Sequence, residues 1–289
     1  MAKRYLVLAL GVVSVSFAAI FIRLAEAPVL VIAAYRLMLA SLIITPMACA
    51  RAKSEFLGLM KAGLALPLLS GVLLALHFVL WIASLTYTTV ASSVVLVTAN
   101  PVFVALASHF LFREKLSRQV ILGIAVCLAG AAIIGYGDWT LGCKPLLGDL
   151  LALAGAIAAA GYFLIGRKLR QTTGVLSYAA IVYGSAALAL LLSVLVFQYP
   201  LLGYSTTTYI MLVLLALIPQ TVGHLSLTWS LRFVSATLVT IAVLGEPVGA
   251  TLLALIMLHE VPTLTQVLGG TLILTGIFLA FRKRIPRAK

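Results

Sequence analysis

Charged residues are scarce in this 289-residue sequence, where Asp, Glu, Lys and Arg together make up 9% of the chain. Soluble domains carry about 25%. Apolar residues make up 63%, the mean hydropathy is +1.21, and no polar stretch is long enough for a soluble domain. These values exclude an ordinary water-soluble protein, so we predict an all-α polytopic membrane protein.

Cysteine is also rare, and several catalytic motifs are missing. The three cysteines, Cys49, Cys127 and Cys143, have neither metal-site spacing nor the even number of a disulfide framework. The chain has no H-E-x-x-H, no G-x-S-x-G, no paired aspartates and no P-loop. We therefore expect no enzymatic activity, no metal or other cofactor, and no direct use of ATP.

Acidic side chains number only seven against 20 basic ones, which gives a net charge of +13. In a soluble protein this charge would favour nucleic-acid binding. Here the basic residues lie between apolar runs, so we expect a lipid bilayer and no nucleic acid as the partner. With the N-terminus in the cytoplasm, 17 basic residues fall in inner loops and only Arg23 and Lys144 in outer ones. The positive-inside rule then predicts that both termini are cytoplasmic.

Ten apolar segments are long enough to cross a bilayer. The first follows Lys3 and Arg4 and resembles a signal peptide, but no small-x-small site precedes a polar start, so we retain it as a helix. The ten predicted spans are 5–24, 28–48, 64–85, 89–112, 119–137, 147–166, 175–198, 208–231, 236–258 and 264–282.

An internal repeat relates the two halves of the chain. At an offset of 146, residues 77–137 lie over 223–283 without a gap, and Asn100-Pro101 aligns with Glu246-Pro247. We expect a first unit of residues 1–140 and a second of 141–289, with five spans each. Since five is odd, the second unit enters the membrane inverted. Inverted repeats with interrupted spans are typical of alternating-access carriers, whose site lies near mid-membrane.

Residues 99–130 and 245–276 carry the strongest motifs. In each, Asn100-Pro101 or Glu246-Pro247 is followed 13 residues after the proline by Glu114 or Glu260, and then by a glycine-bearing helix. Over nearly the whole chain, the sequence resembles the drug/metabolite transporter superfamily, EamA type. This resemblance implies ten helices in two inverted five-helix repeats around a central cavity, and a bacterial inner-membrane protein. Among these transporters it looks most like the exporters of aromatic and neutral amino acids.

Strongly polar side chains within predicted spans are costly in a bilayer, so they are expected to face a cavity or one another. Helix breaks at proline free backbone carbonyls as further acceptors. We predict three helix breaks, at Pro101, Pro219 and Pro247. The predicted substrate-binding residues are Arg36, His77, Trp81, Asn100, Gln220, His224, Thr228 and Glu246.

Structural roles remain open for the same residues. Glu246 could pair with Arg36, and Arg36 could instead reach outward to the membrane surface. Asn100 could bond a carbonyl freed by Pro101, and the histidines and Trp81 could only fill space between helices. The prolines could produce simple kinks. Tyr87, Tyr162 and Tyr183 are assigned nearer to the helix ends.

The sequence therefore favours a secondary transporter that exports aromatic or neutral amino acids or related small metabolites by alternating access. Export of other metabolites or drugs, or a channel-like facilitator, is the alternative. Glycines such as Gly130 and Gly276 predict close helix packing in spans 5 and 10, as a scaffold or a dimer surface. A monomer and a homodimer remain equally open.

Overall fold

The computed structural model describes residues 2–112, 118–140, 143–234 and 236–281, and these form helices joined by short turns, without a strand among them. The helices are α1 (Ala2–Ser16), α2 (Ala18–Leu24), α3 (Val29–Arg51), α4 (Lys53–Ala62), α5 (Ala65–Ser84), α6 (Val90–Val97), α7 (Asn100–Phe112), α8 (Arg118–Thr140), α9 (Cys143–Leu169), α10 (Val175–Val196), α11 (Thr206–Leu215), the π-helix η1 (Ala216–His224), α12 (Leu225–Ser230), α13 (Ala236–Val243), α14 (Gly245–Met257) and α15 (Leu264–Phe281).

Helices form at all ten predicted positions because an α-helix satisfies its own backbone hydrogen bonds where no water is present. Within the described residues, seven helical segments are long and apolar enough to span a membrane, and shorter apolar helices occupy 121–137, 245–257 and 264–276. The predicted all-α polytopic membrane fold is therefore confirmed. The short helix α4 was not predicted, because it lies in the polar connection after the second span.

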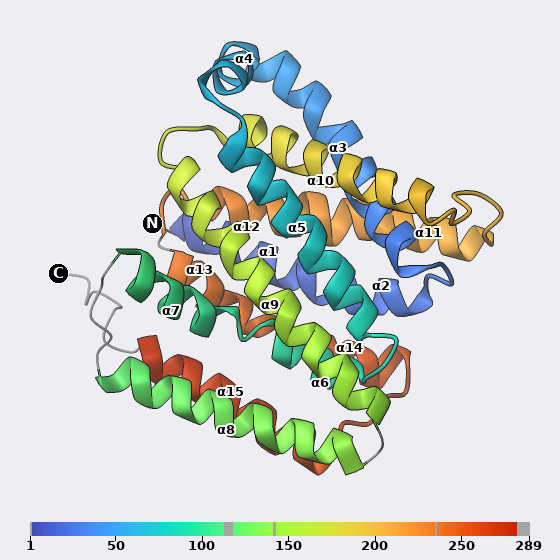
Figure 1. The fold of residues 1–289 in the computed structure, drawn as a ribbon, viewed down its shortest axis with the longest axis vertical. Coiled ribbons are helices and arrows are strands. Elements are labelled where there is room, and N and C mark those ends of the chain that lie inside the picture. The colour runs from blue at the N-terminus through green and yellow to red at the C-terminus, as the bar shows by residue number, and fades with distance from the viewer. Residues whose placement is uncertain (1, 113–117, 141–142, 235, 282–289) are drawn as a thin grey trace.

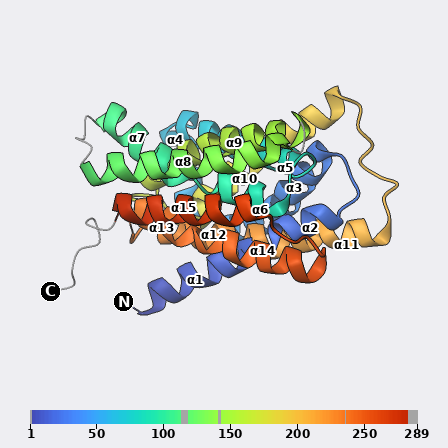
Figure 2. The same ribbon diagram turned by 90° about the horizontal axis from the view of Figure 1, so that it is seen from below.

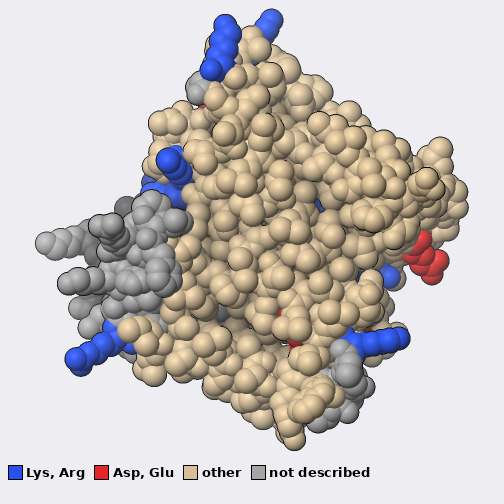
Figure 3. Space-filling model, viewed as in Figure 1, with Lys and Arg blue, Asp and Glu red and all other residues tan. Residues whose placement is uncertain are grey.

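The bundle is built from helix pairs that are distant in sequence. Helix α3 packs on α10, α5 on α9, and α8 on α15 along one edge (Figures 1 and 2). The start of α1 and the end of α15 lie on the same side of the bundle, as an even number of crossings requires (Figure 1). Most visible Lys and Arg side chains lie at the rim, while a broad surface without charge crosses the face that would meet lipid (Figure 3).

Two spans are interrupted where the sequence places a polar residue before proline. Thr98 and Ala99 separate α6 from α7, and Leu244 separates α13 from α14. The Thr98 hydroxyl donates to the carbonyls of Val94 and Val95, at 2.8 and 3.1 Å, which satisfies the end of α6. Both interruptions lie just before the prolines named above, and Leu244 keeps αR backbone dihedrals at the second one.

The eighth span contains a nine-residue π-helix with Pro219 inside it. Proline removes a backbone donor, and π-helical turns accommodate the resulting mismatch, often at functional sites. The Thr221 hydroxyl donates to the carbonyl of Ala216 at 2.7 Å, five residues earlier. Around Pro219 the helix is therefore wider than a regular α-helix.

Glycine allows α8 and α15 to lie in close contact. A Cβ atom on Gly130 would lie 2.6 Å from the carbonyl oxygen of Gly269, and one on Gly276 would lie 2.6 Å from that of Gly123. Contacts this short leave no room for a side chain. The prediction of a glycine-dependent scaffold is confirmed, and here the scaffold joins two helices of the same chain.

The division into units 1–140 and 141–289 remains a prediction. Helices at equivalent positions of the two units pair with each other, as α3 does with α10 and α8 with α15. Glu114, half of the predicted repeat motif, lies outside the described residues.

Candidate functional site

A small cavity lies at the centre of the bundle, next to both helix breaks. Six of the eight predicted site residues line it: Arg36, His77, Trp81, Asn100, His224 and Glu246. Its volume is about 30 Å³, enough for a few water molecules. The structure therefore shows a narrow cavity at the site.

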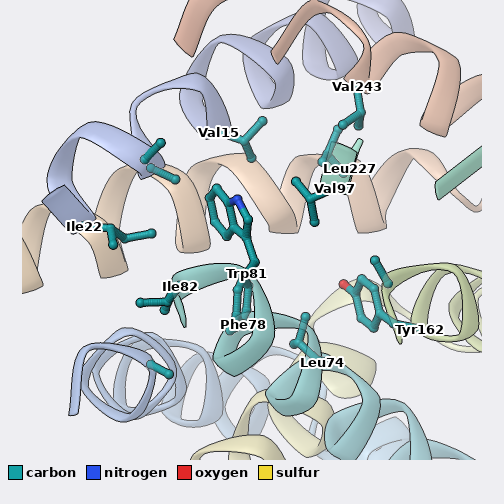
Figure 4. Close-up of a cluster of buried hydrophobic side chains, with 14 of the residues drawn as sticks. Val15, Ile22, Leu74, Phe78, Trp81, Ile82, Val97, Tyr162, Leu227 and Val243 are labelled. Carbon is teal, nitrogen blue, oxygen red and sulfur yellow. The ribbon is translucent and has the colours of Figure 1, made fainter. Parts of the chain in front are cut away.

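Apolar side chains complete the cavity wall. Figure 4 shows Val15, Val97, Leu227 and Val243 around the indole of Trp81, each from a different helix. A pocket with mainly apolar walls and a few polar groups is typical of sites for small organic molecules.

Arg36 lies on α3 and is completely buried, so it does not reach the membrane surface. Its Nε donates to Oε1 of Gln220 at 2.8 Å. Its guanidinium carbon lies 3.8 Å from the ring centre of Phe78 and 5.9 Å from that of Trp81. Both terminal nitrogens, Nη1 and Nη2, lack a hydrogen-bond partner among the residues that the structure describes. A buried cation with two free donor groups at a cavity wall is prepared to receive an anion.

Glu246 and Asn100 are placed by the helix breaks. Asn100 is the first residue of α7, and Glu246 lies in the first turn of α14. Helix N-termini favour negative charge, which offsets part of the cost of burying the Glu246 carboxylate. Oδ1 of Asn100 has no hydrogen-bond partner in the structure. Both residues therefore offer acceptor oxygens beside the cavity.

Arg36 and Glu246 interact electrostatically, but no ion pair joins them in the described part of the chain. Two opposite charges thus lie beside one cavity without direct contact. This arrangement leaves both charges accessible to a third, dipolar molecule.

His77 and Trp81 project from the same face of α5, as their spacing of four predicts. Their rings lie nearly parallel, with centroids 6.1 Å apart. Nδ1 of His77 lies 3.0 Å from the carbonyl oxygen of Gly155, which identifies it as the protonated nitrogen. His224 lies across from His77, with ring centroids 6.5 Å apart. Both histidines line the cavity, and Trp81 is buried rather than placed at the membrane interface.

Gln220 and Thr228 are buried but do not line the cavity. Gln220 accepts a hydrogen bond from Nε of Arg36, while Thr228 forms a 2.7 Å hydrogen bond with the Tyr162 hydroxyl. In a regular α-helix these two residues, eight positions apart, would share one face of the eighth span, but the π-helix η1 changes the turn between them.

Tyr162 and Tyr183 were wrongly assigned to helix ends. Helix α9 extends to Leu169, three residues beyond the predicted span, so Tyr162 lies within the bundle and lines the cavity. Tyr183 is buried on α10 beside Gln220 and Arg36. The sequence did contain a signal for the burial of Tyr183. This residue lies two turns after the start of the seventh span, and a polar group at that depth in a membrane needs a partner.

Arg170 directly follows the span Lys144–Leu169 and links α9 to α12. Its Nε donates to the carbonyl of Thr228 at 3.2 Å, and its Nη1 donates to the carbonyl of Thr173. Burial lowers the pKa of Arg170 to about 10, so it remains protonated at neutral pH. This cation anchors the helix that carries Thr228.

A family model described as the EamA-like transporter family matches residues 2–136 and 146–282. A Clostridium kluyveri protein, described as an uncharacterized transporter, is 26% identical over 254 residues, covering 84% of this chain and 80% of that protein. A probable terminal-alkyne amino-acid exporter of Streptantibioticus cattleyicolor is 26% identical over 202 residues, covering 67% of this chain and 65% of the exporter.

Two further comparisons concern a part of the chain and its fold. A probable 4-amino-4-deoxy-L-arabinose-phosphoundecaprenol flippase subunit, ArnE of Hamiltonella defensa, is 33% identical over 69 residues, or 24% of this chain and 62% of that protein. One crystal structure superimposes with a TM-score of 0.71 over 99% of both chains, at 18% identity. At that identity the superposition shows the fold alone.

Proposed function

Because this chain belongs to the EamA-like transporter family, we propose that it is a secondary carrier that exports amino acids or related small metabolites through the central cavity. Its substrate would bind among Arg36, His77, Trp81, Asn100, His224 and Glu246. Gln220 and Thr228, predicted to bind substrate directly, would act through Arg36 and Tyr162 instead.

The observation that carries this proposal is the separation of Arg36 from Glu246. The cavity presents a cation with two free donor groups and a carboxylate, which form no ion pair with each other. A zwitterionic amino acid carries both complementary charges on one carbon atom. Apolar and aromatic groups of the wall, among them Trp81, Tyr162 and Phe163, suit a neutral or aromatic side chain.

The narrow cavity and the interrupted helices support alternating access. A space of about 30 Å³ is narrow for an amino acid, so we expect helices to move when the substrate enters. The breaks before α7 and α14 provide such points of movement at mid-span. A channel-like facilitator, the second candidate, would need a continuous water-filled path, whereas a narrow cavity favours a carrier.

Export is proposed from a relative, and orientation from the charges of the loops. The Streptantibioticus relative is named as an amino-acid exporter, and export by this chain is proposed by analogy with it. The excess of basic residues in predicted inner loops favours cytoplasmic termini in a bacterial inner membrane.

Flux in proteoliposomes tests the proposal. We expect at least one radiolabelled neutral or aromatic amino acid to show saturable flux and counterflow, with and without a pH gradient. Flux that rises linearly with concentration and shows no counterflow would support the channel alternative. If none of the twenty amino acids moves, the amino-acid assignment is wrong.

A further inference from the structure

Arg36 is held in a fixed orientation by two contacts that do not neutralise it. On one edge, Nε donates to Oε1 of Gln220 at 2.8 Å. One face of the guanidinium lies over Phe78 at 3.8 Å. Both Arg36 and Gln220 are fully buried, so solvent does not exchange with these contacts. The planar group therefore keeps one direction, on a residue that lines the cavity.

The group that accepts the hydrogen bond from Nε of Arg36 is the neutral amide of Gln220, and this has an electrostatic consequence. A carboxylate at the position of Gln220 would fix Arg36 equally well but would cancel its charge. The neutral amide orients the guanidinium and leaves its positive charge available. Nη1 and Nη2 lack hydrogen-bond partners in the structure, and Glu246 forms no ion pair with them. An unpaired buried cation is costly, which is expected where a ligand completes it.

The irregular eighth span supports the placement of Gln220. Gln220 follows Pro219 within η1, and Tyr183 of α10 lies beside it. In this π-helix the residue reaches α3 while His224, one turn later, lines the cavity. The same π-helix thus provides Gln220, which holds Arg36 in place, and His224, which lines the cavity.

We propose that Gln220 is a positioning residue that keeps Arg36 oriented and uncompensated, so that the site requires a carboxylate on its substrate. This inference rests on the proposed transport function and specifies the substrate class. Two parallel N–H groups of a guanidinium match the two oxygens of a carboxylate. Substrate amines without a carboxylate would leave Nη1 and Nη2 unpaired and would therefore bind more weakly.

Thermal shifts in detergent test this role without requiring transport. The probes are 3-phenylpropionate, which has a carboxylate and no amine, and 2-phenylethylamine, which has an amine and no carboxylate. We compare wild type with Gln220→Glu, with the near-isosteric Gln220→Met, and with Gln171→Glu. The last is a matched control, because it makes the same charge change at an exposed position in the turn after α9.

Wild type and Gln171→Glu are expected to melt at a higher temperature with 3-phenylpropionate, and Gln220→Glu to lose that shift. In Gln220→Met the apparent affinity for 3-phenylpropionate should fall by about tenfold or more, because Arg36 loses a hydrogen bond to a charged group. Without ligand, Gln220→Glu should melt above Gln220→Met, since its carboxylate compensates Arg36. A purely structural role for Gln220 would not remove the carboxylate shift selectively.

Two results would overturn the inference: no carboxylate shift in wild type, or an equal shift in wild type and Gln220→Glu. Transport remains a separate test. If proteoliposomes move no amino acid while the carboxylate shift depends on Gln220, the proposed substrate is wrong and the anion site stands. If amino acids are transported equally by wild type and Gln220→Glu, the carrier stands and the positioning role is wrong.

Discussion

The backbone N–H of Val90 donates to Oε2 of Glu260 at 2.9 Å, although 170 residues separate them. The other carboxylate oxygen lies 3.4 Å from Nη2 of Arg23, which also donates to the carbonyl of Thr88 at 2.6 Å. Glu260 therefore caps the N-terminus of α6 and links it to the end of α2. These contacts join three segments at the end of the bundle that is predicted to face outward.

Replacing Glu260 by alanine should destabilise the protein by about 0.5–2 kcal/mol, mainly through loss of the cap on α6. The half-exposed ion pair with Arg23 should add at most about 1 kcal/mol. Melting in detergent measures the effect, with Glu26→Ala as a control on an exposed carboxylate nearby in the predicted outer region. Equal melting temperatures for the two variants would show that the cap does not stabilise α6.

The close contact of α8 and α15 predicts a strong dependence on Gly130. A Cβ there would lie 2.6 Å from a backbone oxygen, so Gly130→Ala should cost about 1–3 kcal/mol by forcing the helices apart. Gly58 on α4 is the matched control, because nothing lies within 4 Å of its added Cβ. Gly58→Ala should be neutral or stabilising, since alanine favours helix. Equal thermal stability of the two variants would contradict the packing described here.

The positions of the spans and their breaks could be predicted from the sequence, because long apolar runs and prolines act locally. The contribution of Tyr162 could not, because it depends on the true length of α9 and on the approach of Thr228. The role of Gln220 was also beyond prediction. Its face depends on the π-helical turn, which the helical spacing of the sequence does not reveal, and its partner Arg36 lies 184 residues away.

The hydrogen bond between Tyr162 and Thr228 should couple α9 to α12. Tyr162→Phe and Thr228→Val each remove the 2.7 Å hydrogen bond and should each cost about 0.5–1.5 kcal/mol. Either substitution alone removes the whole hydrogen bond. The double variant should therefore be less destabilised than the sum of the two single variants. Detergent unfolding of the four proteins measures this coupling. Additive effects would show that the bond contributes nothing of its own.

Cysteine accessibility should map the cavity. In a background without native cysteines, we expect His77→Cys, Asn100→Cys and His224→Cys to react with small polar thiol reagents and to be protected by substrate. Thr228→Cys should remain unreactive, since Thr228 lies behind Tyr162. Lys144→Cys, on an exposed position, gives the reference rate. If the three cavity positions stay inert while Lys144→Cys reacts, the substrate path lies elsewhere.

The most direct test of the central cavity as the transport site is the paired measurement of flux and melting in Glu246→Gln. Glutamine keeps the shape of Glu246 but removes its charge, and Glu246 forms no ion pair with Arg36 in the structure. We therefore predict that amino-acid export falls by about tenfold or more, with melting close to wild type. Glu26→Gln should retain full export as the matched control. Full export by Glu246→Gln with unchanged melting would contradict the account. A loss of melting temperature that Arg36→Gln restores would also contradict it, by showing that Glu246 only balances the charge of Arg36.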